Sequence, residues 1–447
     1  MKPLCVISCP IDTFSGYGAR SRDFVKALLK SKKEEWEIFI MPQRWGDTPQ
    51  GFLSKKDPLR ALFRNSNQLQ TNKPDIWIQI TIPSEFQPVG GFNIGVTAGI
   101  ESTIYPGDFI EGFNRMDLNL VSSNHSKESA LKTRYEKIDK DTKKIVELTE
   151  IQKPQDMDVL FEGLDLNTYF KKPSKTTILE NIPEEFCFLY TGHWLQGILG
   201  EDRKNVGLMI KTFLETFNTS SSKKPALILK TGHVNFSISD REAILNNILN
   251  IKKGVKGSLP NIYLLHGEMT DEEMNLLNND PKVKSFLSFT KGEGFGRPIL
   301  EGAITGKPTI ISNWSGHTDF LKPDYNILVG GELKNIHESA ANKWLLKESQ
   351  WFNIDIPVAK KAMKDVFKNY KKYITKSRKQ TQYIKDNWSF DKMVDKLNSI
   401  LNSYSSKIKI YSPQTVDVKL PKLKKLKTDT ESKLPELKLP KLKKIKA

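Results

Sequence analysis

One segment of the sequence combines an apolar run, a glycine-rich turn and a helix-starting proline, and it limits the fold more than any other. Residues 283–289 form the apolar run, Gly294 and Gly296 flank Phe295, and Pro298 follows. Glycine lets a backbone approach a ligand without Cβ interference, and proline suits the first turn of a helix because its missing N–H would be unpaired there. We therefore predict a strand, a turn and a helix N-terminus, an arrangement that favours anion binding.

Two carboxylates bracket this turn. Glu293 precedes Gly294, and Glu301 lies about one turn into the predicted helix. A carboxylate repels phosphate, so Glu301 is expected to bind another group, and a ribose diol is the natural partner. The plainer alternative is that both are exposed loop and helix carboxylates.

The spacing of these carboxylates resembles the E-x7-E signature of group 1 retaining glycosyltransferases (glycosyltransferase family 4 type), and the resemblance continues through residues 289–313. It implies an α/β protein of the GT-B fold, with two Rossmann-like domains facing a central cleft and a C-terminal helix returning to the first domain. It also implies a metal-independent hexosyltransferase that moves a sugar from a UDP or GDP donor to an acceptor hydroxyl. No Asp-x-Asp element stands at a predicted strand end, which agrees with this chemistry.

The pattern of apolar runs predicts two successive α/β sheets. Polar insertions are expected at 42–74 and 137–155, and a helical region from 336 to 401, with Trp388 near the hinge between the domains. The expected domains are an acceptor-side domain at 1–170, a nucleotide-sugar-binding domain at 171–372, helices packing back on the first domain at 373–406, and a disordered basic tail at 407–447.

Composition indicates a soluble protein of a reducing compartment. The 447 residues contain no apolar run of the roughly 18 residues that a membrane span needs. Only Cys5, Cys9 and Cys187 are present, an odd and sparse set that favours free thiols, with a zinc site or disulfide as the alternative. Cys5 and Cys9 are expected on one strand face. We expect a cytoplasmic location, with peripheral association at a membrane surface through the tail.

The tail carries much of the net charge of +17. Residues 407–447 hold thirteen lysines and four acidic residues, and residues 419–427 are nearly repeated at 438–446. Prolines and dense like charge disfavour a packed core. Residues 419–446 are candidates for contact with an anionic membrane surface or nucleic acid. This gives a second functional hypothesis, a charge-driven binding protein, beside the alternative of an inert extension.

The family resemblance assigns a basic pair for the donor diphosphate to Arg203 and Lys204. Such cations stabilise the negative charge that develops on the leaving diphosphate. Many family members place an arginine where this sequence has His193, so His193 either donates to phosphate, lines the cleft or leaves its role to Arg203. Arg297 reaches the diphosphate or points to water, and the plainer interpretation of Arg203 and Lys204 is a solvated face.

The first predicted helix begins at a glycine-containing loop. Gly16 and Gly18 resemble a nicotinamide fingerprint only weakly, because Ser21 stands at the third glycine position and no acidic residue ends the next strand at Met41. A dehydrogenase is therefore not expected. The resemblance places this loop against the donor phosphate or the acceptor.

The resemblance also suggests residues that contact the sugars. Glu101 faces the acceptor and orients or deprotonates its hydroxyl, His125 is the second candidate, and the leaving phosphate itself could accept the proton. The plainer alternatives are a helix or turn cap for Glu101 and a helix N-terminal residue for His125. Gly316 and His317 are expected near the donor sugar.

No cofactor is expected, since the nucleotide-sugar is a substrate, and no metal ligands are assigned. The acceptor is left open among glycan, lipid, protein and nucleic acid. A GT-B-fold epimerase or phosphorylase is the alternative enzyme, although no lysine is placed for a pyridoxal cofactor.

Overall fold

Apolar runs in the N-terminal part form a six-stranded parallel sheet in the computed structural model, which describes residues 2–65, 73–138, 145–172, 177–194, 199–233 and 236–410. Parallel strands are covered on both faces and are therefore apolar throughout, and all five residues of the fourth strand are buried. Ile7 pairs with both Ile40 and Ile78. The spatial order of strands is β2 (Glu37–Pro42), β1 (Leu4–Cys9), β3 (Ile76–Ile80), β4 (Phe92–Val96), β5 (Leu118–Val121) and β8 (Met157–Val159).

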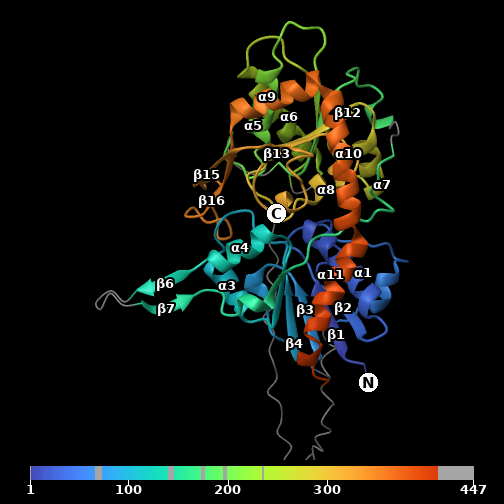
Figure 1. Ribbon diagram of the computed structural model, residues 1–447, viewed down its shortest axis with the longest axis vertical. Coiled ribbons are helices and arrows are strands. Elements are labelled where there is room, and N and C mark those ends of the chain that lie inside the picture. The colour runs from blue at the N-terminus through green and yellow to red at the C-terminus, as the bar shows by residue number, and fades with distance from the viewer. Residues whose placement is uncertain are drawn as a thin grey trace, which may run out of the picture. The chain divides into compact units, whose positions relative to one another are not determined.

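Helices cover both faces of this first sheet. The helix α1 (Gly16–Lys32) packs on one face beside the C-terminal helix α11 (Phe390–Ser403), and the two lie side by side in Figure 1. Cys5 and Cys9 are buried and free on that face, as predicted. The other elements of this region are η1 (Pro58–Leu62), η2 (Pro83–Glu85), α3 (Gly107–Asn114), α4 (Asn124–Lys132), the antiparallel pair β6 (Tyr135–Ile138) and β7 (Ile145–Thr149), and η3 (Pro154–Asp156).

Residues 42–65, part of the expected surface insertion, are mostly exposed or partly exposed, but two of their side chains reach the core. Leu53 and Leu59 are buried against the first sheet. The Leu53 amide donates to the Asp12 carboxylate at 2.8 Å, and the guanidinium of Arg22 lies 3.4 Å from the centre of the Phe52 ring. These contacts with α1 and the loop before it explain why a polar segment is held in place.

A second six-stranded parallel sheet follows in the chain. Its strands, in spatial order, are β11 (Ile262–Leu265), β10 (Ala226–Lys230), β9 (Cys187–Thr191), β12 (Val283–Ser288), β13 (Thr309–Ser312) and β14 (Ile327–Val329). Strand order reverses beside β9, so the carboxyl ends of β9 and β12 form a switch point, where parallel sheets bind ligands. The other elements are η4 (Thr177–Leu179), α5 (Val206–Thr216), α6 (Ile238–Lys253), α7 (Asp271–Asn279), α8 (Arg297–Ala303), η5 (Gly316–Asp319) and α9 (Ile356–Lys368).

The expected helical region from residue 336 is wrong at its start. Two strands, β15 (Gly331–Asn335) and β16 (Gln350–Ile354), form an antiparallel pair, and helix begins only at Ile356, where the Asp355 side chain accepts from the Val358 amide. Tertiary pairing overrides local propensity here. Gln350 also exchanges two hydrogen bonds with Thr103 of the first region, at 2.9 and 3.0 Å.

The C-terminal helices α10 (Tyr370–Asn387) and α11 return the chain to the first sheet. Trp388 is the C-cap of α10, and its carbonyl accepts from the Leu164 amide at 2.8 Å. The Phe390 amide donates to the Leu164 carbonyl at 2.8 Å. Trp388 also packs against Phe161, Phe295 and Phe320. The returning helix was therefore predicted correctly.

The described chain continues through η6 (Ser405–Lys407) to residue 410. Lys407 pairs with Asp156 at 3.2 Å and Ile408 packs on the core of the first sheet, so the disorder predicted from 407 is wrong for these two residues. Most of that prediction, including residues 419–446, lies outside the described residues. None of the helices in the described part of the chain combines the length and hydropathy needed to cross a bilayer.

Candidate active site

The glycine turn connects β12 to α8, as predicted. Gly296 is the N-cap of α8 with φ of 98°, a left-handed conformation that favours glycine, and Pro298 lies in the first turn of the helix. Phe295 is buried against Phe320. The turn is therefore fixed both by its backbone conformation and by the aromatic side chain at its centre.

Arg203 and Lys204 converge on Glu293. The Lys204 Nζ donates to both carboxylate oxygens of Glu293, at 2.6 and 2.8 Å. Arg203 donates to the Gly292 carbonyl at 2.9 Å and lies 3.7 Å from the Glu293 carboxylate. Burial alone would raise the pKa of Glu293, but Lys204 and Arg203 outweigh it and lower that pKa to about 2. The two cations are thus held together beside the carboxyl ends of β9 and β12 and are not a solvated face.

Glu301 belongs to a second buried ionic group. Arg297 Nε donates to the Glu301 carboxylate at 2.9 Å, and another guanidinium nitrogen of Arg297 pairs with Asp23 of α1. The side chain of Arg297 therefore does not point to water, which corrects one of its two expected positions. Burial raises the pKa of Glu301 to about 7, because it outweighs the lowering by Arg297.

Glu101 reaches the basic pair from the first sheet. Its carboxylate lies 3.4 Å from Arg203, so Glu101 is not simply a cap. The backbone is equally close: a Cβ added to Gly292 would lie 1.9 Å from the Glu101 carbonyl oxygen, and one added to Gly294 would lie 2.1 Å from that of Ala98. Only glycine fits at these two points of contact.

His125 lies near Glu101 at the start of α4. Its ring packs edge-on against Trp314, with centroids 4.6 Å apart, and its Nε2 atom is buried without a hydrogen-bond partner among the described residues. Burial, followed by the nearby His317, lowers the pKa of His125 to about 4, so the ring is neutral at pH 7.

Gly316 and His317 pack directly behind Glu293. The Gly316 amide donates to the Glu293 carbonyl at 2.9 Å, and a Cβ at Gly316 would lie 2.3 Å from the Gly294 carbonyl oxygen. His317 Nε2 carries a proton, because it lies 2.7 Å from the Ser312 carbonyl, which can only accept. Its Nδ1 has no partner within the described ranges.

The remaining predicted residues lie at the edges of this group. Gly18 packs against Thr13, where a Cβ would lie 2.3 Å from the Thr13 carbonyl oxygen, whereas Gly16 has open space. His193 is exposed after β9, and its carbonyl accepts from the Tyr190 hydroxyl at 3.1 Å. Neither glycine contacts the basic pair in any hydrogen bond or ion pair of the described chain.

A cavity of about 640 Å³ opens beside Glu101 and Arg203, a volume within the range of about 300–1,000 Å³ typical of small-molecule sites. Trp194 and His233 line it from the second sheet, and residues 339–342, 344 and 345 close its far side. Among the residues that the structure describes, no cluster of three His, Cys, Asp or Glu side chains could hold a metal ion.

No protein-family model matches the sequence, and a comparison with curated proteins finds no match. Solved structures do resemble the chain. HepE from Anabaena, in complex with UDP and glucose, is 14% identical with a TM-score of 0.53 over 90% of this chain and 100% of its own. A glycosyltransferase from Rickettsia africae is 13% identical with a TM-score of 0.57 over 91% and 99% of the two chains. Sucrose-phosphate synthase from Thermosynechococcus elongatus is 11% identical with a TM-score of 0.57 over 91% and 100%.

The chain has the GT-B fold. The predicted fold class is therefore correct, and the roles of the predicted site residues remain predictions. Sequence reasoning missed several residues of this GT-B site that join its two sides. Asp23 pairs with Arg297, Ser122 donates to the Gly294 carbonyl at 3.0 Å, and Asp319 accepts from the Asn124 amide at 2.8 Å. No sequence signal marked them, because each acts on a partner more than 170 residues away in the chain.

Proposed function

We propose that the protein is a retaining glycosyltransferase that transfers a hexosyl group from a UDP- or GDP-sugar to an acceptor hydroxyl. The observation that carries the proposal is the convergence of Arg203 and Lys204 on Glu293 at the switch point of the second sheet. Two buried cations at such a point suit a diphosphate. Structural neighbours in complex with UDP or UDP-glucose support a nucleotide-sugar donor.

The chemistry follows from the charges. Breaking the bond between sugar and phosphate leaves negative charge on the diphosphate, and Arg203 and Lys204 stabilise that charge more in the transition state than in the donor. Amides of the turn at 294–296 assist them. Glu293 faces the sugar as oxocarbenium character develops, and Glu301 binds the ribose diol of the donor.

The acceptor side supplies the base. Glu101 lies beside Arg203 and orients or deprotonates the acceptor hydroxyl, with His125 as the second candidate and the leaving phosphate as the third. Gly316 and His317 contact the donor sugar. Gly16, Gly18, His193 and Arg297 complete the surroundings of the donor. The reaction uses no cofactor and no metal, and the acceptor is a glycan, lipid, protein or nucleic acid.

The test is turnover of a panel of UDP- and GDP-sugars, followed by mass spectrometry, with the anomeric configuration of the product determined by NMR. Lys204→Met should abolish turnover and weaken UDP binding. Lys211→Met is the matched control, since Lys211 lies in the helix α5 that follows Lys204, with a side chain that is 40% exposed and pairs with Glu215. No affinity for any nucleoside diphosphate would refute the proposal, and phosphate-dependent cleavage or sugar inversion without transfer would identify a phosphorylase or an epimerase.

A second proposal concerns the tail. The charge of residues 407–447 favours contact between residues 419–446 and an anionic surface, which would bring a cytoplasmic enzyme to a membrane. Truncation after Ile410, which keeps Lys407 and Ile408 on the core, should then abolish co-sedimentation with phosphatidylserine vesicles and leave donor turnover intact. Unchanged sedimentation, or a loss confined to DNA retention, would refute membrane association.

A further inference from the structure

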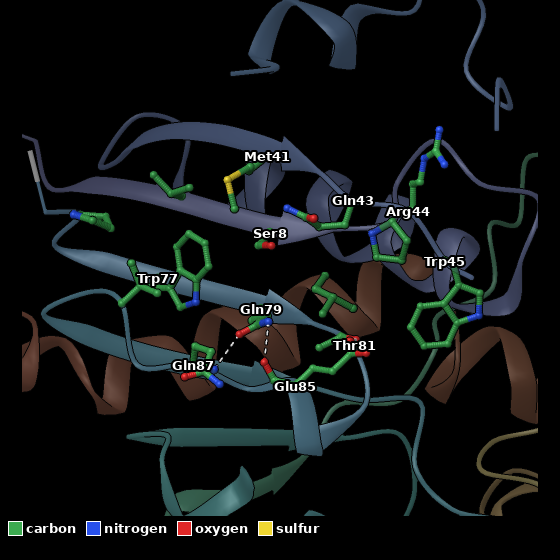
Figure 2. Close-up of a pocket in the computed structure, with 15 residues that line it drawn as sticks. Ser8, Met41, Gln43, Arg44, Trp45, Trp77, Gln79, Thr81, Glu85 and Gln87 are labelled. Carbon is green, nitrogen blue, oxygen red and sulfur yellow. Dashed lines mark hydrogen bonds between the residues drawn. The ribbon is translucent and has the colours of Figure 1, made fainter. Parts of the chain in front are cut away.

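A second cavity, of about 530 Å³, lies on the first sheet (Figure 2). Its floor comes from alternate residues of adjacent strands, which point to the same face: Val6 and Ser8 of β1 pair with Trp77 and Gln79 of β3. Met41 of β2, opposite Ser8, extends the floor. The intervening residues face the core under α1 and α11, so the cavity lies on the other face of the sheet.

Two tryptophans give this cavity flat apolar surfaces. Trp77 and Trp45 lie toward its two ends in Figure 2, and Trp77 is only 6% exposed. Trp45 is held by stacking on Tyr17, with ring centroids 4.0 Å apart and an interplanar angle of 27°. Rigid indole faces bury large apolar area at little entropic cost.

Uncommitted polar groups surround these faces. The side chain of Gln79 already has hydrogen-bond partners. Its amide nitrogen donates to the Glu85 carbonyl at 2.9 Å, and its oxygen accepts from the backbone amide of Gln87 at 2.8 Å, as the dashed lines of Figure 2 show. The side chains of Ser8, Gln43 and Gln87 have no hydrogen-bond partner among the described residues. Hydroxyl and amide groups both donate and accept.

We propose that this cavity binds a sugar ring of the acceptor. The C–H face of a pyranose is apolar and fits an indole, while its equatorial hydroxyls match groups that both donate and accept. An alkyl chain would leave the amides unsatisfied, and a nucleotide would bring negative charge to a site whose cation is Arg44 at the exposed rim. The acceptor is therefore a glycan or a glycoconjugate that carries a sugar beyond the reacting hydroxyl.

A chain of residue contacts leads from the wall of this cavity to the candidate active site. The Tyr17 hydroxyl that lies behind Trp45 is 2.8 Å from the Thr97 hydroxyl and 3.3 Å from the Ala98 amide nitrogen. The Ala98 carbonyl in turn lies against Gly294. Trp45 is thus linked through Tyr17 to the loop that carries Glu101. This inference rests on the proposed function, but its test is separate.

The test uses the full-length protein in saturation-transfer NMR. The probes are methyl glycosides of glucose, galactose, mannose and N-acetylglucosamine, and the disaccharides maltose, lactose and chitobiose, each at about 10 mM. Uridine and octyl phosphate represent the competing ligand classes. Variants are Trp45→Ala and Gln43→Leu, both at partly or fully exposed positions that tolerate change, and Gln152→Leu, an exposed glutamine of the same region, is the control.

At least one saccharide should bind, and each cavity variant should weaken its binding by about tenfold or more while Gln152→Leu leaves it unchanged. Hydrolysis of the donor without acceptor should be unaffected by Gln152→Leu. Binding of no saccharide, preference for octyl phosphate or uridine, or equal saccharide binding by the cavity variants would overturn the inference. Absence of donor turnover together with saccharide binding would instead count against the proposed function alone.

Discussion

The glycine at position 294 allows the two sheets' loops to meet, and its replacement by alanine gives a direct test of this packing. A Cβ at Gly294 would lie 2.1 Å from the Ala98 carbonyl oxygen, a backbone atom that cannot rotate away. The loops would have to separate by roughly 1 Å, and overpacking of this kind costs about 1–3 kcal/mol. Because a misplacement of about 1 Å lowers turnover about 100-fold, Gly294→Ala should retain its fold and lose most of its transfer activity.

The assay compares kcat/KM for transfer, the affinity for UDP and the Tm of Gly294→Ala with those of Gly330→Ala. Gly330 is the matched control, since a Cβ there would have no atom within 4 Å and its φ is not positive. We expect the control to match the wild type in all three measurements. If Gly294→Ala keeps wild-type kcat/KM, the close approach of Gly294 to Ala98 has no part in catalysis and the reasoning fails.

Three other predictions concern buried or partly buried side chains. Glu293→Gln leaves the buried Lys204 without its carboxylate and Arg203 with Glu101 alone. It should lower the free energy of unfolding in urea by about 3–5 kcal/mol, with partial recovery on adding Lys204→Met; a cost below about 1 kcal/mol would refute the pairing. The pKa of Glu301 rises from 4.5 to about 7 on folding, so its contribution to stability falls as pH rises through this range. Glu301→Gln should remove up to about 3 kcal/mol of this decrease in the free energy of unfolding, which shows as a flatter dependence of Tm on pH between pH 5 and 8. A pH dependence of Tm equal to that of the wild type would contradict this prediction. Trp388→Ala should lower the free energy of unfolding in urea by about 3 kcal/mol. The control Trp344→Ala changes a side chain that is 47% exposed and should have little effect. Equal effects of the two variants would argue against the packing role of Trp388.

The sheets and the key turn were predictable because their signals are local. The apolar runs that become β1 and β12 need no distant partner to be recognised, and only glycine suits the left-handed N-cap at 296. The same holds for the returning helix α11, where Ser389 caps a regular apolar stripe. Local chemistry therefore gave the two α/β sheets and the position of the turn, whereas the family resemblance gave the GT-B architecture.

The parts that could not be predicted depend on partners far away in the chain. Strand β15 is exposed at all five residues and is a strand only because it pairs with β16. Its own sequence therefore lacks the alternation of apolar and polar residues by which a strand is predicted. The position of Arg297 is likewise set by Asp23, a residue on another sheet's helix. A single sequence contains both residues of such a pair but not their proximity.

The cavity with Trp45 and Trp77 shows the same limit at a binding surface. Trp77 belongs to a buried-type strand and would be assigned to the core by its pattern, and Trp45 lies in a segment expected at the surface. Only the parallel register of β1 and β3 brings Ser8 and Gln79 to the same floor. A binding surface that combines residues of several strands therefore cannot be predicted from sequence motifs, even where each strand is predicted correctly.

Charge balance connects the two sides of the candidate active site. Arg203 lies between Glu101 and Glu293, and Lys204 is paired with Glu293, so two cations are balanced by two carboxylates in a largely buried group. A diphosphate that binds Arg203 and Lys204 adds negative charge, and a buried excess of charge is costly. Glu101 is the more exposed carboxylate, with a side chain 37% exposed against 9% for Glu293, so it separates from Arg203 at lower cost. If the donor binds as proposed, its arrival frees Glu101 to face the acceptor hydroxyl, and the order of binding follows from electrostatics: donor first, acceptor second.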